Sequence, residues 1–400
     1  IPGGTDTISI VLSTDSGANY NKLIATGVDA TTGSYSWNTN ATAVGALADG
    51  STYRIKITDG LTGVDFSSTD FMVDNTDPVT TATLNPAAPD GENGWYVTTP
   101  TITLTCDDGA GSGCASTYYK WDDGLYSLYT GTFDALEGDH TLSFYSQDTA
   151  VDAAGGHNVG VALPQQIKVD TVHPTFNASS TTSNGSYNEG DNINVTLTFS
   201  EPVFSDALKV WLDTDLPLVP AYCITPAFSN ATTNSCTYIV SAGHNTADLT
   251  VSPFVAALSG IIKDVAGNES TPNLPYTPIS NIADTSDIVI DTTAPIAFTT
   301  GAVATTGGNV VAGWWNSTNT GIDVSVPVDN DNSLVGGTIQ LQAEANGTFE
   351  NIGLAYTILL SDIATTKMLS LTAADVEALT GFAEGEVLAF RAIITDLAAN

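Results

Sequence analysis

The same short segment occurs three times in the sequence: an aliphatic residue, an aspartate and, four residues after the aspartate, a proline. The copies occupy residues 73–78, 169–174 and 290–295. Because proline cannot donate a hydrogen bond to a neighbouring strand and stiffens the chain, each copy is typical of a last strand followed by a short linker. The copies lie roughly one domain length apart. We call them the anchors, and they predict a series of small modules.

A second repeated segment lies upstream of the anchors. It consists of a glycine-containing turn, a strand-like run and an aspartate-led loop, which is typical of a turn that leads into a β-strand. Copies lie at residues 47–59, 136–148 and 382–396, and the end of a copy is present at 260–264. A further similarity relates Asn93–Tyr96 to Ala312–Trp315.

The two repeats together predict four domains, which we call modules 1 to 4. Their expected bounds are residues 1–76, 77–172, 173–293 and 294–400. The last aspartate-led loop ends at Asn400, so the logic of the repeat predicts one more strand and linker after it. Module 4 is therefore expected to be incomplete at its C-terminal end. Since the chain opens with Ile1 rather than Met, we expect a processed protein or a piece of a longer one.

Strand signals dominate within the modules. Val195–Phe199 alternates apolar and polar residues, as Ile8–Leu12 does more loosely, and Thr, Val, Ile and Tyr favour strands. One helix is expected over Ala373–Thr380, with Thr372 as its cap. Short strands in units of about 100 residues are typical of two-sheet sandwiches. The expected fold class is all-β, with tandem immunoglobulin-like β-sandwich domains arranged as beads on a string.

The charge balance excludes two classes of partner. Nine Lys and Arg stand against 44 Asp and Glu, for a formal net charge of −35. Nucleic acid and anionic membranes would both be repelled by such a chain. The longest apolar run, Val255–Ile262, is strand-sized and far shorter than the ~18 residues of a membrane span. With 42% hydrophobic residues, the chain also lacks the low hydrophobicity of disordered proteins.

The four cysteines allow three pairings. If the two close pairs lie in different modules, only Cys106–Cys114 and Cys223–Cys236 can form, and a glycine-rich turn lets the first pair approach. Two disulfides would indicate an oxidising compartment. The alternative is four reduced thiols buried in strands. The spacing of zinc-binding Cys-x-x-Cys motifs is absent.

Module 3 resembles a bacterial immunoglobulin-like repeat of large surface and secreted proteins. The similarity rests on Tyr187–Asp191, Val195–Val203, Ala221–Tyr222, Asp248–Leu249 and Ile262–Asn268. Module 2 resembles another extracellular immunoglobulin-like type through Thr105–Gly109 and Ser112–Trp121, and module 1 is similar to fibronectin-like modules through Leu12–Gly17 and Gly33–Trp37. Module 4 keeps the aspartate-led loop but has Ala399 where the family has glycine. The resemblance implies that the modules serve as spacers, adhesion elements or lattice subunits.

A calcium site is the most specific site hypothesis that the sequence supports. Ca²⁺ takes six to eight oxygen ligands, and the anchors and aspartate-led loops are rich in oxygen-bearing side chains. An ion at a module boundary would stiffen the joint. The alternative is that Asp and Asn only build turns. The candidate ligands are Asp264, Asn268, Asp74, Asp77, Asp170 and Asp291. Asp329–Ser333 begins like an EF-hand loop, but Leu334 and Gln340 replace its Gly and Glu, so we expect a polar turn.

Catalysis has little support in the sequence, and we expect that the chain is not an enzyme. The four histidines lie far apart, and the motifs of zinc proteases, serine hydrolases and P-loop proteins are absent. Candidate glycosylation sequons in a secreted context lie at Asn40, Asn177, Asn184, Asn230, Asn316 and Asn346.

Three functional hypotheses follow. In the first, the chain is an extracellular structural protein of a bacterium or archaeon, a repeat segment of a surface layer, filament or adhesin stalk whose partners are copies of itself or other surface proteins. In the second, the modules are adhesive and bind carbohydrate through an exposed aromatic face. In the third, they are accessory domains of a larger secreted enzyme. A salt-loving host is an alternative reason for the acidity.

Overall fold

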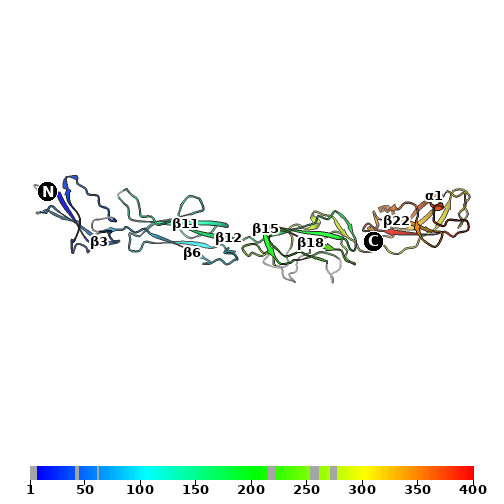
Figure 1. The fold of residues 1–400 in the computed structure, drawn as a ribbon, viewed down its shortest axis with the longest axis horizontal. Coiled ribbons are helices and arrows are strands. Elements are labelled where there is room, and N and C mark those ends of the chain that lie inside the picture. The colour runs from blue at the N-terminus through cyan, green and yellow to red at the C-terminus, as the bar shows by residue number, and fades with distance from the viewer. Residues whose placement is uncertain are drawn as a thin grey trace. The chain divides into compact units, whose positions relative to one another are not determined.

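The computed structural model describes residues 7–40, 45–60, 63–152, 154–214, 221–252, 261–270 and 277–400. These residues form an all-β protein with several small, mainly antiparallel sheets and one short α-helix (Figure 1). The chain divides into two compact units. The first contains residues 1–172 and 266–268, and the second contains residues 173–265 and 269–400. Within the described residues, no helix is long and apolar enough to cross a membrane.

Module 1 contains one sheet in the strand order β2-β1-β3-β4, with β5 also paired to β3. Its strands are β1 (Thr7–Ser13), β2 (Lys22–Asp29), β3 (Gly50–Thr58), β4 (Val64–Phe66) and β5 (Phe71–Val73), and a 3-10 turn, η1, spans Ala30–Thr32. The strands expected at Ile8–Leu12 and after the first glycine turn lie within β1 and β3. Leu12 and Tyr53 are buried in the small core between them.

Module 2 contains two sheets, in the orders β10-β7-β6 and β12-β11-β8-β9. Its strands are β6 (Val79–Asn85), β7 (Thr101–Asp107), β8 (Cys114–Trp121), β9 (Ser127–Leu128), β10 (Phe133–Asp134), β11 (Gly138–Asp148) and β12 (Leu163–Val169). The alternating side chains of β11 bury Leu142 and Phe144, which pack with Ile102 of the other sheet. Asp148 ends β11 and is itself fully buried.

Module 3 is built around the long strand β15, which pairs with β13 and β18. Its strands are β13 (Phe176–Ser179), β14 (Gly185–Tyr187), β15 (Asn192–Ser205), β16 (Lys209–Trp211), β17 (Tyr222–Ile224), β18 (Phe228–Ile239) and β19 (Ile288–Ile290), and η2 spans Ile282–Asp284. The expected alternation over Val195–Phe199 lies in β15, where Val195 and Leu197 are buried. Most of the apolar run Val255–Ile262 lies outside the described residues.

Module 4 again has two sheets, β20-β21-β25 and a second in which β22 pairs with β23, β24 and β26. Its elements are β20 (Val303–Thr306), β21 (Gly321–Pro327), η3 (Asn332–Leu334), β22 (Thr338–Glu344), β23 (Glu350–Asn351), β24 (Tyr356–Thr357), η4 (Leu360–Asp362), β25 (Thr366–Thr372), α1 (Ala373–Glu377) and β26 (Ala389–Thr395). The expected helix is present but ends at Glu377 rather than Thr380. Its cap is Thr372, whose hydroxyl accepts from the Asp375 amide.

Four separate clusters of buried apolar side chains are present in the described residues. They span residues 10–73, 84–169, 176–290 and 322–394, so each falls inside one of the expected modules. The structure joins Cys106 to Cys114 and Cys223 to Cys236. The two disulfides indicate an oxidising environment. The division into four domains at the stated residues stays a prediction.

Candidate metal centre

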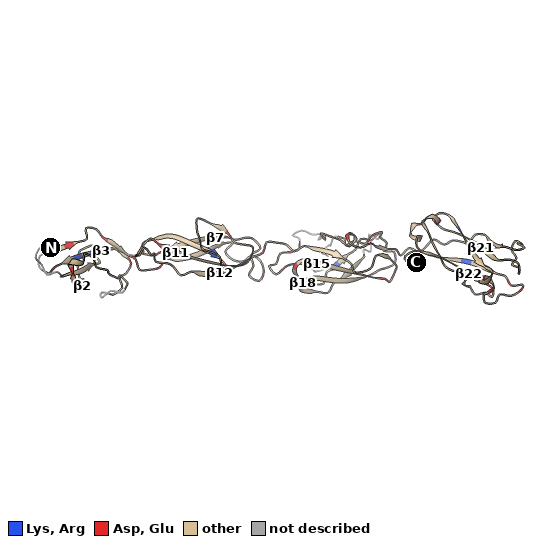
Figure 2. Cartoon of the chain, turned by 90° about the horizontal axis from the view of Figure 1, so that it is seen from above, with Lys and Arg blue, Asp and Glu red and all other residues tan. Residues whose placement is uncertain are grey.

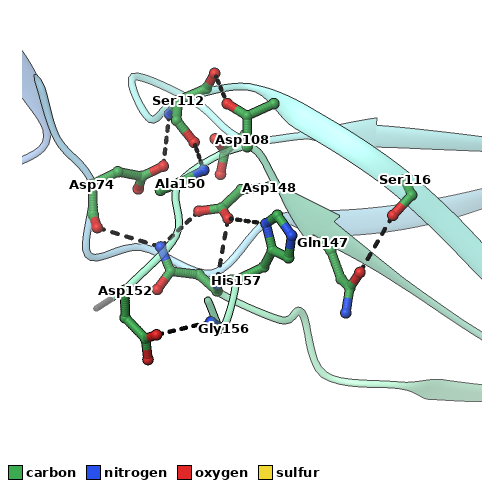
Figure 3. Close-up of polar contacts among 12 residues, drawn as sticks. Asp74, Asp108, Ser112, Ser116, Gln147, Asp148, Ala150, Asp152, Gly156 and His157 are labelled. Atoms are coloured by element: carbon green, nitrogen blue, oxygen red, sulfur yellow. Dashed lines mark hydrogen bonds and ion pairs between the residues drawn. The ribbon is translucent and has the colours of Figure 1, made fainter. Parts of the chain in front are cut away.

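Three aspartates from three different elements meet in the first compact unit (Figure 3). Asp74 directly follows β5, Asp108 directly follows β7, and Asp148 is the last residue of β11. One carboxylate oxygen from each lies within 4.8 Å of the others. We call these three residues the acidic triad. Asp74 belongs to the first anchor, so the triad ties an anchor to two loops of the module that follows it.

Short main-chain hydrogen bonds hold two of the carboxylates. Asp74 Oδ2 accepts from the Ser112 amide at 2.7 Å, and Asp108 Oδ2 accepts from the Gly113 amide at 2.7 Å. A Cβ on Gly111 would lie 2.5 Å from Asp108 Oδ2 and 2.9 Å from Asp74 Oδ1. A side chain at position 111 would therefore collide with both carboxylates, which explains the glycine there.

Asn158 supports the third carboxylate. Its main-chain and side-chain amides donate to Asp148 at 3.1 and 2.6 Å, and the same side-chain amide donates to the main-chain carbonyl of Asp74 at 3.3 Å. The imidazole of His157 lies 3.9 Å from Asp148. One amide side chain thus links the anchor to the aspartate-led loop.

One oxygen of the triad is buried without a partner. Asp108 is 8% exposed, and its Oδ1 has no hydrogen-bond partner among the described residues. A buried carboxylate oxygen without a partner costs free energy, because its hydration is lost and nothing replaces it. Neither Lys nor Arg forms an ion pair with the triad in the described part of the chain. The missing interaction is one that a cation would supply.

The pKa values of the triad differ in direction. Burial raises the pKa of Asp108, and the negative charge of Asp74 raises it further. Burial likewise raises the pKa of Asp148. Burial also acts to raise the pKa of Asp74, but hydrogen bonds from Ser112 hold it below its usual value. Two buried carboxylates and the half-buried one of Asp74 resist full ionisation together, since like charges at close range repel each other in a poorly solvated site.

The donor set fits a hard divalent cation. Carboxylate and carbonyl oxygens are the ligands that Ca²⁺ takes, whereas zinc favours nitrogen and sulfur. The disulfide Cys106–Cys114 closes the loop that carries Asp108 and the amides of Ser112 and Gly113. That covalent closure positions two of the three carboxylates.

The predicted calcium ligands have different surroundings. Asp74 joins the triad, whereas Asp77 is exposed and has no hydrogen bond or ion pair with the described residues. Asp170 offers its main-chain carbonyl to the side-chain amide of Asn268 at 2.8 Å. Asp264 and Asn268 are both buried.

Asp291 lies near two other carboxylates. Burial raises its pKa, and Asp396 and Asp331 add to the rise. Its main-chain carbonyl accepts from the side-chain amide of Asn400 at 2.8 Å, and Asn400 also donates to Asp396 at 3.0 Å. Three carboxylate oxygens within 4.8 Å of one another are not found here among the described residues. The prediction for Asp291 stays untested.

Sequence reasoning missed Asp108, Asp148 and Asn158 as site residues. Asp148 was recognised as the head of an aspartate-led loop but not as a ligand, and Asp108 was seen only as part of the disulfide loop. The available signal was positional. Asp148 is the last residue of β11, Asp396 directly follows β26, and the loop after each of them contains an Asn, Asn158 or Asn400. That recurrence favours a shared role for the Asp and Asn pair.

The remaining predicted residues lie at the surface. Asp329–Ser333 forms a turn into η3, where Asp331 caps the Ser333 amide, as the polar-turn reading predicted. Of the glycosylation candidates, Asn316 is half-buried and the others, Asn40, Asn177, Asn184, Asn230 and Asn346, are exposed. Their modification stays untested.

Comparison with known proteins gives no assignment. No family model matches the chain, and a search of curated proteins finds no significant relative. The resemblance noted in the sequence therefore remains a hypothesis about the family, and the site rests on its own geometry.

Proposed function

We propose that this chain is a structural segment of an extracellular surface protein, in which immunoglobulin-like modules are tied together at calcium-binding joints. It would serve in a surface layer, a filament or an adhesin stalk rather than as a catalyst. The supporting observation is a hydrogen bond that recurs at all three anchors. An Asn side chain donates to the main-chain carbonyl of the anchor aspartate at Asp74, at Asp170 and at Asp291.

The acidic triad supports the calcium part of the proposal. Asp74 comes from the end of one module, and Asp108 and Asp148 come from the next. A cation that binds all three would link the two modules only when both are folded and in register. Since it binds the folded form alone, its free energy of binding adds to the stability of the joint.

The charge of the chain supports assembly controlled by cations. Acidic residues greatly outnumber the few basic ones over the whole chain (Figure 2), and the net charge is −35. Copies would repel one another at low ionic strength, and the repulsion would fall as salt or divalent cations screen it. Sheet edges and exposed apolar side chains would then make contact with neighbouring copies.

Electron microscopy of the native material, with and without a calcium chelator, tests this proposal. We expect ordered sheets or filaments that come apart on chelation and reform when Ca²⁺ is returned. Magnesium at the same concentration is the matched control, since it demands stricter octahedral geometry and dehydrates reluctantly. Isolated particles that chelation leaves unchanged would contradict both the assembly and the calcium joint.

One surface favours carbohydrate binding as a second candidate. Tyr118 stacks on Tyr145 at 5.3 Å, Tyr126 meets Tyr145 edge-on, and Lys120 lies over the Tyr126 ring. Tyr126 is 38% exposed, so an aromatic ring is available for stacking on a sugar. Glycan-array binding that is lost in Tyr126→Ala would support this candidate, and an array without signal would dismiss it.

A further inference from the structure

The larger sheet of module 2 has an outer face that the alternation of its strands defines. In β8, Tyr119 packs against the core, so Tyr118 points away from it. In β11, Phe144 is buried, so Tyr145 lies on the outer side. The strand register places Leu128, Tyr118 and Tyr145 in one row across β9, β8 and β11. We call this surface the tyrosine face, and it is defined by Tyr118, Lys120, Tyr126, Leu128, Ser143 and Tyr145.

Three aromatic rings meet on the tyrosine face beside exposed leucines. Tyr118 stacks on Tyr145 with ring centroids 5.3 Å apart, and Tyr126 meets Tyr145 edge-on at 4.8 Å. Tyr126 is 38% exposed, Leu128 is 53% exposed, and Leu125 in the adjoining loop is 92% exposed. In module 2 only residue 153 lies outside the described part of the chain. Large apolar side chains that are exposed together mark a surface where another molecule binds.

The tyrosine face is free of carboxylates, although the module around it is acidic. No outward position of β8 over residues 116–120 or of β11 over residues 141–147 is Asp or Glu. Asp122 directly follows β8 and Asp139 lies at the start of β11, so both are at one end of the sheet. Asp148 ends β11 but is buried on the inner side. A patch without negative charge thus lies within a strongly acidic chain.

This charge pattern favours a second copy of the chain as the occupant. Because the net charge is −35, two copies repel each other, and the repulsion is weakest where neither contact surface carries a carboxylate. A neutral ligand would not require such a surface. Lys120 Nζ lies 5.3 Å over the Tyr126 ring and forms no ion pair within the described residues, so it can donate to an acceptor of the second copy. Tyrosine enrichment and depletion of charge are also typical of the centres of protein interfaces.

We propose that two copies of the chain associate through their tyrosine faces, in a two-fold contact in which the same residues of both copies meet. The two sheets pack face to face around the Tyr118–Tyr145 pair. Their strands run antiparallel, which keeps the acidic ends of the two sheets apart and brings Lys120 of each copy to Gln147 of the other. The proposal rests on the part of the proposed function in which copies of the chain associate, and it does not require calcium at the acidic triad.

Sedimentation of the full 400-residue chain in a calcium chelator tests this contact, because assembly that needs calcium is then excluded. We expect an equilibrium between monomer and dimer. Its dissociation constant should fall at least about tenfold between about 0.1 M and about 1 M NaCl, because the Debye length shortens from about 10 Å to about 3 Å and the repulsion between the copies is screened.

Substitutions that add a carboxylate to the tyrosine face should weaken the dimer. Tyr126→Glu changes an exposed side chain, so the module should stay folded, and the dissociation constant should rise at least about tenfold. Lys120→Glu is a second variant on the same face and should act in the same direction. Tyr35→Glu is the matched control, because Tyr35 is 46% exposed in module 1 and the change in charge is the same. Its dissociation constant should stay within about twofold of the wild type.

The proposal is overturned if the chain stays monomeric at every salt concentration, or if Tyr126→Glu and Tyr35→Glu associate equally well. Ordered assemblies in calcium that Tyr126→Glu leaves intact would support the proposed function and overturn this contact. A dimer in chelator without ordered assemblies in calcium would support the contact and contradict the proposed function. A monomeric chain that binds a glycan through Tyr126 would assign the face to sugar and overturn the contact.

Discussion

The side-chain amide of Asn400 donates to the main-chain carbonyl of Asp291 at 2.8 Å, across 109 residues of sequence. Asn158 makes the corresponding bond to Asp74, and Asn268 makes it to Asp170. In each case the acceptor is an anchor aspartate and the donor follows an aspartate-led loop. The recurrence shows that the anchors are fixed by side chains from far along the chain, and it motivates the predictions below.

Removing the amide of Asn158 should loosen the first joint. Asn158→Ala leaves the Asp74 carbonyl and one Asp148 oxygen without their donor, so we expect a loss of about 1–3 kcal/mol in the free energy of unfolding. Chemical denaturation checks the size of the loss. Asn400→Ala is the matched variant in the other compact unit, and the two losses should add when both are combined, because the two sites lie in different compact units and share no partner.

Neutralising Asp108 should weaken calcium binding. Asp108→Asn keeps the shape of the side chain but removes a charged ligand, so we expect the dissociation constant for Ca²⁺ to rise at least about tenfold. Asp107→Asn is the control, because Asp107 is adjacent in sequence but exposed. Isothermal titration calorimetry measures both. Equal affinities of the two variants would exclude Asp108 as a ligand.

Breaking the Cys106–Cys114 disulfide should lower calcium affinity, whereas breaking the Cys223–Cys236 disulfide should not. Cys106→Ser with Cys114→Ser opens the loop that carries Asp108, Ser112 and Gly113, so both stability and calcium affinity should fall. Closing a short loop stabilises by about 2–3 kcal/mol. Cys223→Ser with Cys236→Ser should destabilise module 3 and leave calcium affinity unchanged. Titration of both double variants under oxidising conditions separates the two effects.

The His140–Asp122 pair should make module 2 more stable in mild acid. The hydrogen bond to Asp122 raises the pKa of His140 above its ordinary 6.5. Stability from this pair is therefore fully present below about pH 6.5 and is lost as the pH rises through the raised pKa. The difference in unfolding free energy between the wild type and His140→Gln should shrink as the pH rises above about 6.5. A difference that does not change with pH would contradict the pairing.

The sequence was a good guide to strands because alternation and turns are local properties. Ile8–Leu12 and Val195–Phe199 lie in β1 and β15, and Thr372 caps α1 as expected. The helix ended early at Glu377, since periodicity fixes helix ends poorly.

The site was only partly predictable, because a site depends on which loops meet. Asp74 was predicted as a ligand from its anchor, but its partners Asp108 and Asp148 lie 34 and more residues away and are joined to it only by the packing of three elements. The burial of Asp108, which leaves Oδ1 without a partner, depends on the disulfide loop. No pattern of neighbouring residues encodes that burial. Asp77, which lies in the same anchor, is exposed instead.

Hydrogen exchange of the full chain, with calcium and with a chelator, tests the central claim most directly. The amides of Ser112 and Gly113 donate to Asp74 and Asp108, so a bound ion that holds these carboxylates should slow their exchange. We predict at least about tenfold slower exchange at these two amides in calcium, with the amides of module 4 unchanged. Identical exchange rates in calcium and in chelator would contradict a calcium joint at the acidic triad.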